Sequence, residues 1–220
     1  MTLQNNRVFA SDNDVELLQS EFHVSRETME LFQIYVDLLV EWQGKTNLVS
    51  GSSLADSWRR HICDSVQCKM ILPAKTKWLD IGSGAGFPGL VISILGRNEA
   101  GFNVQLIESN KKKCSFLRKV IRETGTPAEV SSSRIESVTK QYQDIELVSA
   151  RALAPLEKLF ELTSGWLGAG AVGLFPKGRD YLQELEKCRG RWEFDLLVHE
   201  SRIEENSVLL EIQNLEKTGS

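Results

Sequence analysis

The sequence lacks any long run of apolar residues. No stretch of its 220 residues approaches the ~20 consecutive apolar positions that a membrane-spanning helix needs. The first residues, MTLQNNRV, also lack the apolar core of a signal peptide. We therefore expect a cytoplasmic protein that has no membrane partner.

Cysteine is scarce, and its spacing follows no metal-binding pattern. The chain has four cysteines, with neither a C-x-x-C pair nor the spacing of a zinc site. They are Cys63, Cys68, Cys114 and Cys188. We expect reduced thiols, mostly buried as small apolar residues, and no metal ion.

A surplus of positive charge is absent as well. The formal net charge is −4, which argues against non-specific binding of nucleic acid over the whole surface but leaves room for a local basic face.

No repeat, low-complexity tract or linker divides the chain. Its length suits one α/β domain with a modest extension. We place a helical extension at residues 1–72, packed on a Rossmann-like domain at residues 73–220.

The chain is organised around a glycine-rich stretch. Trp78–Ile81 is a short apolar run typical of a buried strand, and Gly82, Gly84 and Gly86 follow it directly. Leu90–Leu95 then fits the buried part of a helix. Strand, glycine turn and helix together predict the first unit of a nucleotide-binding α/β sheet.

The spacing of these glycines distinguishes between cofactors. A dinucleotide fingerprint, G-x-G-x-x-G, requires a small residue where this chain has Phe87. The glycines instead follow G-x-G-x-G, and Asp80 precedes the first of them by two positions. This is the pattern of S-adenosylmethionine-dependent methyltransferases, so an NAD-dependent oxidoreductase is the least favoured interpretation.

A second acidic residue lies at the end of the next predicted strand. Asn103–Glu108 reads as that strand, and Glu108 is its last residue. A carboxylate in this place can accept hydrogen bonds from the ribose hydroxyls of a bound nucleoside. The alternative is that Glu108 only caps the helix that follows, and we favour the ligand role because strand, spacing and residue type agree.

Hydrophobic periodicity predicts the other elements. Residues 1–13 lack periodicity, so we expect a frayed terminus. We expect helices over 14–22, from Ser25 to about Trp42, from Ser53 to Met70, and over 110–122, 156–167 and 181–188. We expect strands over 128–131, 145–150 and 171–175, and an antiparallel pair over 194–198 and 207–212. The helix from Ser53 carries an apolar stripe at i, i+4 steps, formed by Leu54, Trp58, Ile62, Val66 and Met70.

Two polar residues share another face of that helix. His61 and Asp64 are three positions apart, so they can meet on a helix surface. A general-base pair would need a proton to remove, and no Ser or Cys nucleophile is signalled nearby. We therefore expect an ordinary surface pair.

Arg151 follows the strand predicted over residues 145–150, at the edge of the sheet where ligands bind. The Asn/Asp-Pro-Pro-aromatic run of amino-group methyltransferases is absent there, and a planar, permanently charged side chain takes its place. Arg151 either faces the transferred group or forms an ion pair with a carboxylate such as Glu136.

Two further segments gather positive charge. Lys177 and Arg179 flank a glycine after a predicted strand, which suits either a phosphate contact or a loop kept soluble by charge. The helix over residues 110–122 has a basic outer face, which either contacts nucleic acid or is simply solvated. The basic residues of this face are Lys111, Lys112, Lys113, Arg118, Lys119 and Arg122.

Seven short segments between about positions 40 and 180 match the motifs of one protein family, in the order in which that family has them. They are Trp42–Val49, Arg60–Ser65, Asp80–Gly89, Lys111–Leu117, Arg134–Glu136, Ser149–Ala152 and Lys177–Gly178. Together they resemble the bacterial small-subunit ribosomal RNA guanine-N7 methyltransferases, also known as glucose-inhibited division protein B. The glycine motif with its Phe-Pro-Gly ending, joined to the upstream Arg-His-x-x-Asp-Ser run, is the specific part.

The resemblance implies an α/β protein with the Rossmann-like class I S-adenosylmethionine-dependent methyltransferase fold and an N-terminal helical extension. It implies methylation at N7 of a guanine in 16S ribosomal RNA, with S-adenosylmethionine as cofactor and the small ribosomal subunit as partner. We expect a monomer. Two departures from the family pattern are Glu108-Ser109, where Asp-Ser is frequent, and one extra residue between the Arg-x-Glu and Ser-x-Arg segments.

The motifs and the resemblance together give the candidate site residues. As catalytic residues we predict Arg151 and Lys177. As cofactor-binding residues we predict Gly82, Gly84, Gly86, Phe87, Glu108, Ile135, Glu136 and Arg151. As substrate-binding residues we predict Asn47, Arg60, His61, Lys111, Lys112, Lys177 and Arg179.

Methylation at N7 asks for few catalytic groups. The nitrogen already carries an available lone pair and the sulfonium carbon is activated, so the protein has to align the atoms and exclude water. Two alternatives stay open: an enzyme of the same fold that acts on a small molecule or a protein, and a non-catalytic RNA-binding or ribosome-assembly module.

Overall fold

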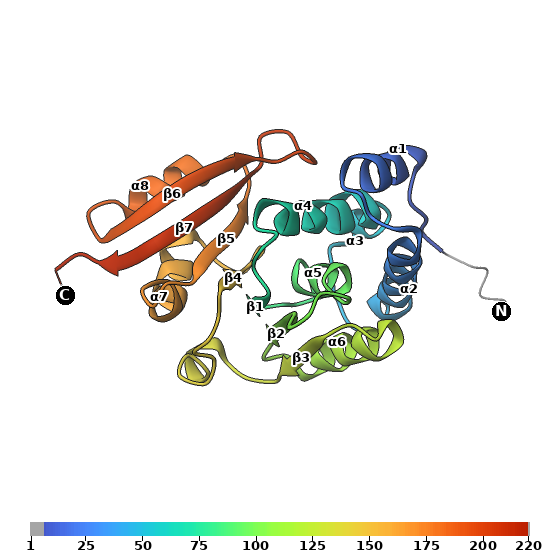
Figure 1. Cartoon of the computed structure of the whole chain (residues 1–220), viewed down its shortest axis with the longest axis horizontal. Coiled ribbons are helices and arrows are strands. Elements are labelled where there is room, and N and C mark those ends of the chain that lie inside the picture. The colour runs from blue at the N-terminus through green and yellow to red at the C-terminus, as the bar shows by residue number, and fades with distance from the viewer. Residues whose placement is uncertain (1–6, 220) are drawn as a thin grey trace.

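The computed structural model describes residues 7–219, which form a seven-stranded sheet in the order β3-β2-β1-β4-β5-β7-β6 (Figure 1). The strands are β1 (Lys77–Ile81), β2 (Asn103–Ile107), β3 (Ala128–Ser131), β4 (Leu147–Ser149), β5 (Val172–Lys177), β6 (Trp192–Glu200) and β7 (Val208–Lys217). The first five strands pair in parallel, and β7 and β6 complete the sheet as an antiparallel pair. This topology confirms the predicted fold class.

Helices cover both faces of the sheet. They are α1 (Asp12–Glu16), α2 (Arg26–Gln43), α3 (Gly51–Leu54), α4 (Asp64–Ile71), α5 (Gly89–Leu95), α6 (Lys111–Thr124), α7 (Leu156–Leu167) and α8 (Tyr181–Cys188). Two π-helical turns, η1 (Leu17–Glu21) and η2 (Trp58–Cys63), and one 3₁₀ turn, η3 (Ile135–Ser137), join them. One apolar core lies beneath α2, α4, α5 and α6, and a second lies beneath α7 and α8.

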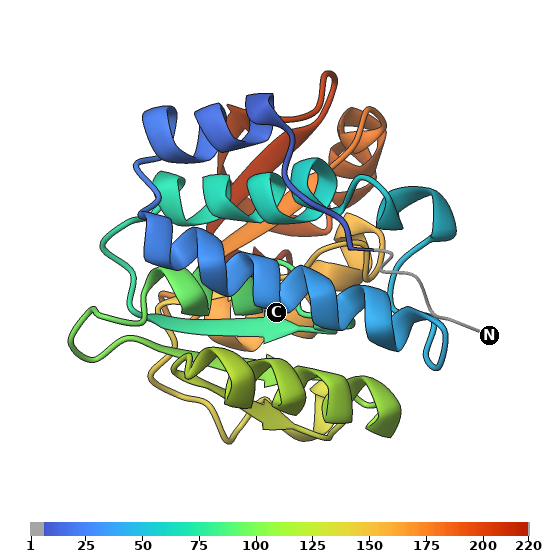
Figure 2. The same cartoon turned by 90° about the vertical axis from the view of Figure 1, so that its right-hand side faces the viewer.

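The N-terminal helices hold the glycine turn in place. Figure 2 shows α2 running across α5, between α4 and α6. Phe32 and Tyr35 of α2 are fully buried, and the Tyr35 hydroxyl donates a 2.5 Å hydrogen bond to the carbonyl of Ala85 in the turn. The extension and the sheet therefore share one core beside the candidate site.

The prediction of a frayed terminus is wrong for residues 7–11, while residues 1–6 lie outside the described part. Arg7 pairs with Asp37 at 2.6 Å, and the carbonyl of Val8 accepts hydrogen bonds from side chains of α2 and η2. Ser11 then caps α1 through its hydroxyl. The terminus is ordered by these contacts with distant residues, so α1 begins two residues earlier than predicted.

The helix predicted from Ser53 to Met70 is also wrong in its continuity. Ser50 rather than Ser53 caps α3, and the chain then passes through the π-helical turn η2 before α4. A π-helical turn holds more residues per turn than an α-helix, so it shifts every later side chain around the axis. Of the predicted stripe, Trp58, Ile62 and Val66 are buried, whereas Met70 is 42% exposed.

Strand ends differ from prediction where sheet pairing decides them. β5 was expected to stop at Phe175 but continues to Lys177, because Lys177 pairs with Val208 of β7. β4 is shorter than the predicted 145–150, and β6 and β7 are longer than 194–198 and 207–212.

Candidate active site

The three glycines of the turn between β1 and α5 have different reasons to be glycine. All three have positive φ, at 64°, 57° and 96° for Gly82, Gly84 and Gly86. A Cβ on Gly82 would lie 2.5 Å from Leu153, and one on Gly86 would lie 2.5 Å from Leu90. A Cβ on Gly84 would meet nothing nearer than 3.7 Å. Neighbouring side chains would therefore have to move for a Cβ at Gly82 or Gly86, whereas a Cβ at Gly84 would make only an ordinary van der Waals contact.

Glu108 ties this turn to the end of β2. Its carboxylate accepts a hydrogen bond from the N–H of Gly84 at 2.9 Å and another from the N–H of Asn110 at 2.7 Å. The side chain of Asn110, not Glu108, caps α6. Each carboxylate oxygen has a second lone pair, so these two bonds leave acceptor sites beside the turn.

Asp80 links the turn to the strand on its other side. It is buried, and its Oδ1 accepts a 2.7 Å hydrogen bond from Ser149 of β4. Its Oδ2 is buried without a partner among the described residues. Burial raises the pKa of Asp80 to about 6.

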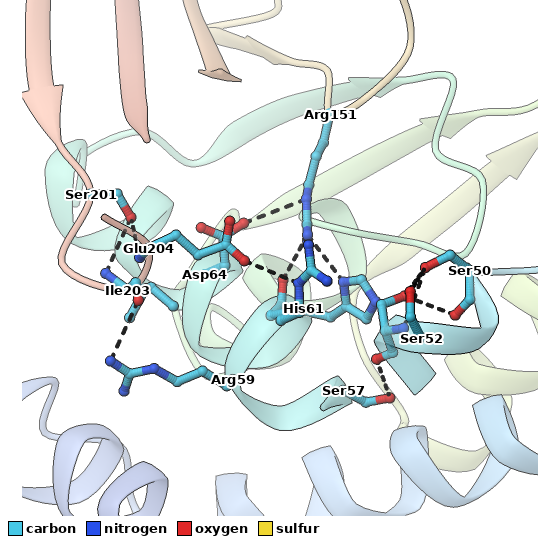
Figure 3. Close-up of polar contacts among 12 residues, drawn as sticks. Ser50, Ser52, Ser57, Arg59, His61, Asp64, Arg151, Ser201, Ile203 and Glu204 are labelled. Carbon is cyan, nitrogen blue, oxygen red and sulfur yellow. Dashed lines mark hydrogen bonds and ion pairs between the residues drawn. The ribbon is translucent and has the colours of Figure 1, made fainter. Parts of the chain in front are cut away.

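Arg151, after β4, is bound to the segment around η2 (Figure 3). Its Nη2 donates to the carbonyl of Arg60 at 2.6 Å and approaches His61 Nδ1 at 3.1 Å, while its Nε lies 3.4 Å from Asp64. Its Nη1 is buried without a partner among residues 7–219. The alternative of an ion pair with a carboxylate is therefore met, but its partner is Asp64, and Glu136, which was named as an example, is exposed on η3.

His61 is held in one tautomer by this contact. A guanidinium only donates, so Nδ1 of His61 accepts and the ring proton lies on Nε2. Burial, with the charges of Arg151 and Arg60, lowers the pKa of His61 to about 3, so the ring is neutral at physiological pH. It stacks on Phe87 with ring centroids 4.8 Å apart. The predicted surface pair of His61 and Asp64 is wrong: both side chains are mostly buried and meet Arg151 rather than each other.

Some of these groups line a cavity of about 380 Å³, which we call the glycine-turn cavity. The predicted cofactor-binding residues Gly86 and Glu108 are not among its lining residues. Its walls are the turn, residues 48–50 and 53, and side chains from η2, α6 and the end of β4. Six predicted site residues line it, namely Gly82, Gly84, Phe87, Arg60, His61 and Arg151. Ser50, Ser53 and Lys113 line it as well, and no motif in the sequence marks the two serines as site residues.

The other predicted site residues lie apart from this cavity in the described structure. Ile135 and Glu136 are on η3, and Lys111, Lys112 and Arg179 are exposed. Asn47 accepts a hydrogen bond from Gln43 at 3.2 Å in the loop after α2. Lys177 lies at the end of β5 instead of in a loop, where its ammonium donates to Glu184 at 2.7 Å and to the carbonyl of Ala154 at 3.0 Å.

Residues 7–219 contain neither a membrane-spanning helix nor a metal-binding cluster. None of the helices there combines the length and the apolar character needed to cross a membrane. No group of three His, Cys, Asp or Glu side chains in that range is arranged to hold a metal ion.

Comparison with known proteins points to one family. Residues 28–208 match the family model GidB, described as rRNA small subunit methyltransferase G. A relative of that name, "Ribosomal RNA small subunit methyltransferase G" from Methylorubrum extorquens, is 44% identical over 90% of this chain and 94% of its own. Another from Rhizobium leguminosarum bv. trifolii is 48% identical over 88% and 96%.

A solved structure supports the fold alone. The crystal structure of a variant of MtNAS in complex with S-adenosylmethionine superposes with a TM-score of 0.55 at 13% identity, covering 90% of this chain and 82% of that one.

Proposed function

This chain belongs to the family of small-subunit ribosomal RNA methyltransferases G, and from that premise we propose that it methylates N7 of a guanine in 16S ribosomal RNA, with S-adenosylmethionine as the methyl donor. The observation that carries the proposal is the glycine-turn cavity at the carboxyl ends of β1 and β4. Ligands of open α/β sheets bind at such a place, where the order of the strands reverses.

The residues in and beside the cavity fit this cofactor. Gly84 leaves room for close approach to the main chain, and Glu108 beside it has acceptor capacity for ribose hydroxyls. Two buried donors, Nη1 of Arg151 and Nε2 of His61, have no acceptor within residues 7–219, and both residues line the cavity. A carboxylate such as that of the methionine moiety satisfies donors of this kind. When bound, S-adenosylmethionine supplies an activated methyl group.

The protein's own residues orient the reacting groups and take no proton. Guanine N7 has a free lone pair, so no base is needed. The neutral Nε2–H tautomer of His61 agrees with this, because its only unprotonated nitrogen already accepts from Arg151. Asp64 and the carbonyl of Arg60 fix the guanidinium at the end of β4. Orientation and exclusion of water are therefore the catalytic contributions that we assign to this site.

The residues outside the cavity keep proposed roles. We propose that Ile135 and Glu136, on η3, contact the cofactor. Asn47, Lys111, Lys112 and Arg179 would contact RNA, together with Arg60 of the cavity wall. Lys177 holds the carbonyl of Ala154 and so supports the loop after Arg151. We also propose that the protein works as a cytoplasmic monomer.

Methyl transfer is the direct test. Labelled S-adenosylmethionine would be incubated with naked 16S ribosomal RNA, with 30S particles and with 70S particles, and the modified nucleoside identified by mass spectrometry. We expect label in 7-methylguanosine for at least one of the three. Label in protein or in a small molecule instead would support the first alternative. Cofactor binding without any transfer would support a non-catalytic RNA-binding module.

A further inference from the structure

A second cavity, of about 430 Å³, shares Arg151 and Ala152 with the glycine-turn cavity. Its walls come from the ends of β4 and β5 and from the start of β7, and we call it the β4–β5 cavity. β7 runs antiparallel to β5, so its first residues lie at the same edge of the sheet as the carboxyl end of β5. The β4–β5 cavity is therefore on the opposite side of the strand-order reversal from β2 and Glu108.

The size and the charges of this cavity suit a neutral, polar ligand. Its volume is in the range of small-molecule sites, ~300–1,000 Å³, and can hold one nucleoside turned out of an RNA strand. Its two cations are already paired, Arg151 with Asp64 and Lys177 with Glu184. A third lining carboxylate, Glu204, leaves the wall acidic, which disfavours a phosphate.

Glu204 is the carboxylate best placed to accept from a ligand. Asp64 already accepts from Gln67 and is ion-paired with Arg151, and Glu184 accepts from Lys177 and from a main-chain N–H. The side chain of Glu204 is 40% exposed, and its Oε1 lies 3.1 Å from Nε of Arg60 in an ion pair.

The main chain holds Glu204 in position. Its N–H donates to the hydroxyl of Ser201, and its carbonyl accepts from the N–H of Ser207. Figure 3 shows this loop between β6 and β7 beside Asp64 and the segment around η2. The loop is fastened to that segment because Arg59 donates to the carbonyl of Ile203 at 3.5 Å.

We propose that the β4–β5 cavity binds the target guanine and that the Glu204 carboxylate accepts hydrogen bonds from its N1–H and N2–H groups. The inference rests on the proposed function. N7 and the N1/N2 edge are on opposite sides of a guanine ring, so a base whose N7 faces the glycine-turn cavity past Arg151 turns its N1/N2 edge away from it. Adenine has a lone pair on N1 in that place, which a carboxylate repels.

The same carboxylate favours the charge that methylation creates. The lone pair of N7 forms the bond to the methyl carbon, the carbon–sulfur bond breaks with its electron pair staying on sulfur, and no proton is released. The purine ring thereby gains one positive charge. A fixed carboxylate at its edge stabilises that charge as it develops.

Nucleotide binding tests the recognition step. The probes are guanosine and adenosine 5′-monophosphate, titrated into the full chain saturated with S-adenosylhomocysteine. We expect the intact protein to bind the guanine nucleotide about tenfold more tightly, the scale of one hydrogen-bonded base edge. Glu204→Gln should bring the ratio of the two dissociation constants close to one, because an amide presents a donor to one of the ring's donors. Glu205→Gln, on the exposed neighbour, should leave the ratio unchanged.

Arg60→Gln separates recognition from the loss of an ion pair. It removes the partner of Glu204 but keeps the carboxylate, so the nucleotide ratio should stay in favour of guanine. The assignment would be overturned if the ratio of the two dissociation constants were the same in the intact protein and in Glu204→Gln. It would also be overturned if Arg60→Gln lost the preference for guanine to the same extent as Glu204→Gln.

Methyl transfer to small-subunit particles distinguishes a failure of the proposed function from a failure of the guanine assignment. Glu204→Gln should lower kcat/KM about tenfold or more, mainly through kcat, while Glu205→Gln stays at the level of the intact protein. If neither the intact protein nor Glu205→Gln transfers a methyl group to RNA, the proposed function fails. If both do and Glu204→Gln equals them, only the guanine assignment fails.

Discussion

Arg151 meets the Arg60 carbonyl, His61 and Asp64 through two of its nitrogens, and a single ammonium cannot reproduce that geometry. Arg151→Lys should therefore weaken cofactor binding by about 2 kcal/mol and lower turnover. The side chain is only 20% exposed, so the variant should also lose some thermal stability, because Asp64 is left partly unpaired. Calorimetry, a methyl-transfer assay and thermal melting measure the three effects.

The matched control is Arg189→Lys, on an exposed pair at the end of α8. It should change none of the three quantities. Full activity of Arg151→Lys with unchanged cofactor affinity would leave Arg151 as a structural partner of Asp64 only.

Alanine at two glycines of the turn should affect folding stability and cofactor binding differently. Gly84→Ala meets no steric contact, so it should cost only about 1–2 kcal/mol of folding free energy for its positive φ, yet weaken cofactor binding. Gly86→Ala places a Cβ 2.6 Å from the Tyr35 hydroxyl and 2.5 Å from Leu90, so its unfolding free energy should fall further. Urea unfolding and calorimetry check both. Equal folding losses in the two variants would contradict the assignment of Gly84 to the ligand side.

The lowered pKa of His61 predicts how stability changes with pH. In the unfolded chain a histidine binds a proton near pH 6.5, whereas in the folded protein the pKa of His61 is about 3. The unfolded state therefore binds more protons between these values, and stability falls as the pH drops through that window. At pH 5 the loss attributable to His61 should be roughly 2 kcal/mol.

A non-titrating variant isolates this effect. The stability difference between the intact protein and His61→Asn should shrink by that amount from pH 8 to pH 5. Asp80, whose pKa is raised to about 6, acts in the opposite direction but is present in both proteins. A difference that is constant with pH would show that His61 titrates normally.

At the scale of elements, α6 carries the charge that most directly concerns RNA. Lys119 and Arg122 contact Glu123, whereas Lys111 and Lys112 are exposed in the first turn. Reversing both of these lysines to glutamate should make the slope of log affinity against log salt for RNA binding shallower, by the amount expected for the loss of about two phosphate contacts. It should not alter cofactor binding, and it should slightly stabilise α6, because acidic residues suit a helix N-terminus.

The control for this change reverses two charges on another helix. Lys187 and Arg189 are exposed at the end of α8, and their reversal should leave the slope of log affinity against log salt as it was. If the slope is the same for all three proteins, the basic face of α6 is only a solvated surface.

At the scale of the molecule, the N-terminal helices and the sheet share one core. Phe32, Tyr35 and Leu39 of α2 belong to the same buried cluster as Leu90 of α5 and Phe116 of α6. A fragment of residues 73–220 would expose that surface, so we expect it to bind a hydrophobic dye and to melt without a cooperative transition. If the fragment melts cooperatively and binds the cofactor, residues 73–220 are an independent domain, with its boundary between residues 72 and 73.

The sequence by itself determined the features that depend on neighbouring residues. The glycine turn, the order of strands and helices and the cap at Ser25 follow from short-range periodicity and turn chemistry. Family membership followed too, because its motifs are short and occur in a fixed order. Half-buried helices such as α6 were predicted within two residues at each end, since one apolar face against a sheet defines them.

Only the tertiary structure decided which distant groups meet. Arg151 and His61 are 90 positions apart, and no local pattern indicates that they touch or that Asp64 replaces Glu136 as the ion-pair partner. The burial of His61, its tautomer and its lowered pKa follow from packing against Phe87 and Arg151. The π-helical turn η2 had the same origin, because local spacing favoured one continuous helix. Partners and burial depend on how elements pack, and packing is a sum over contacts between segments that are remote in sequence.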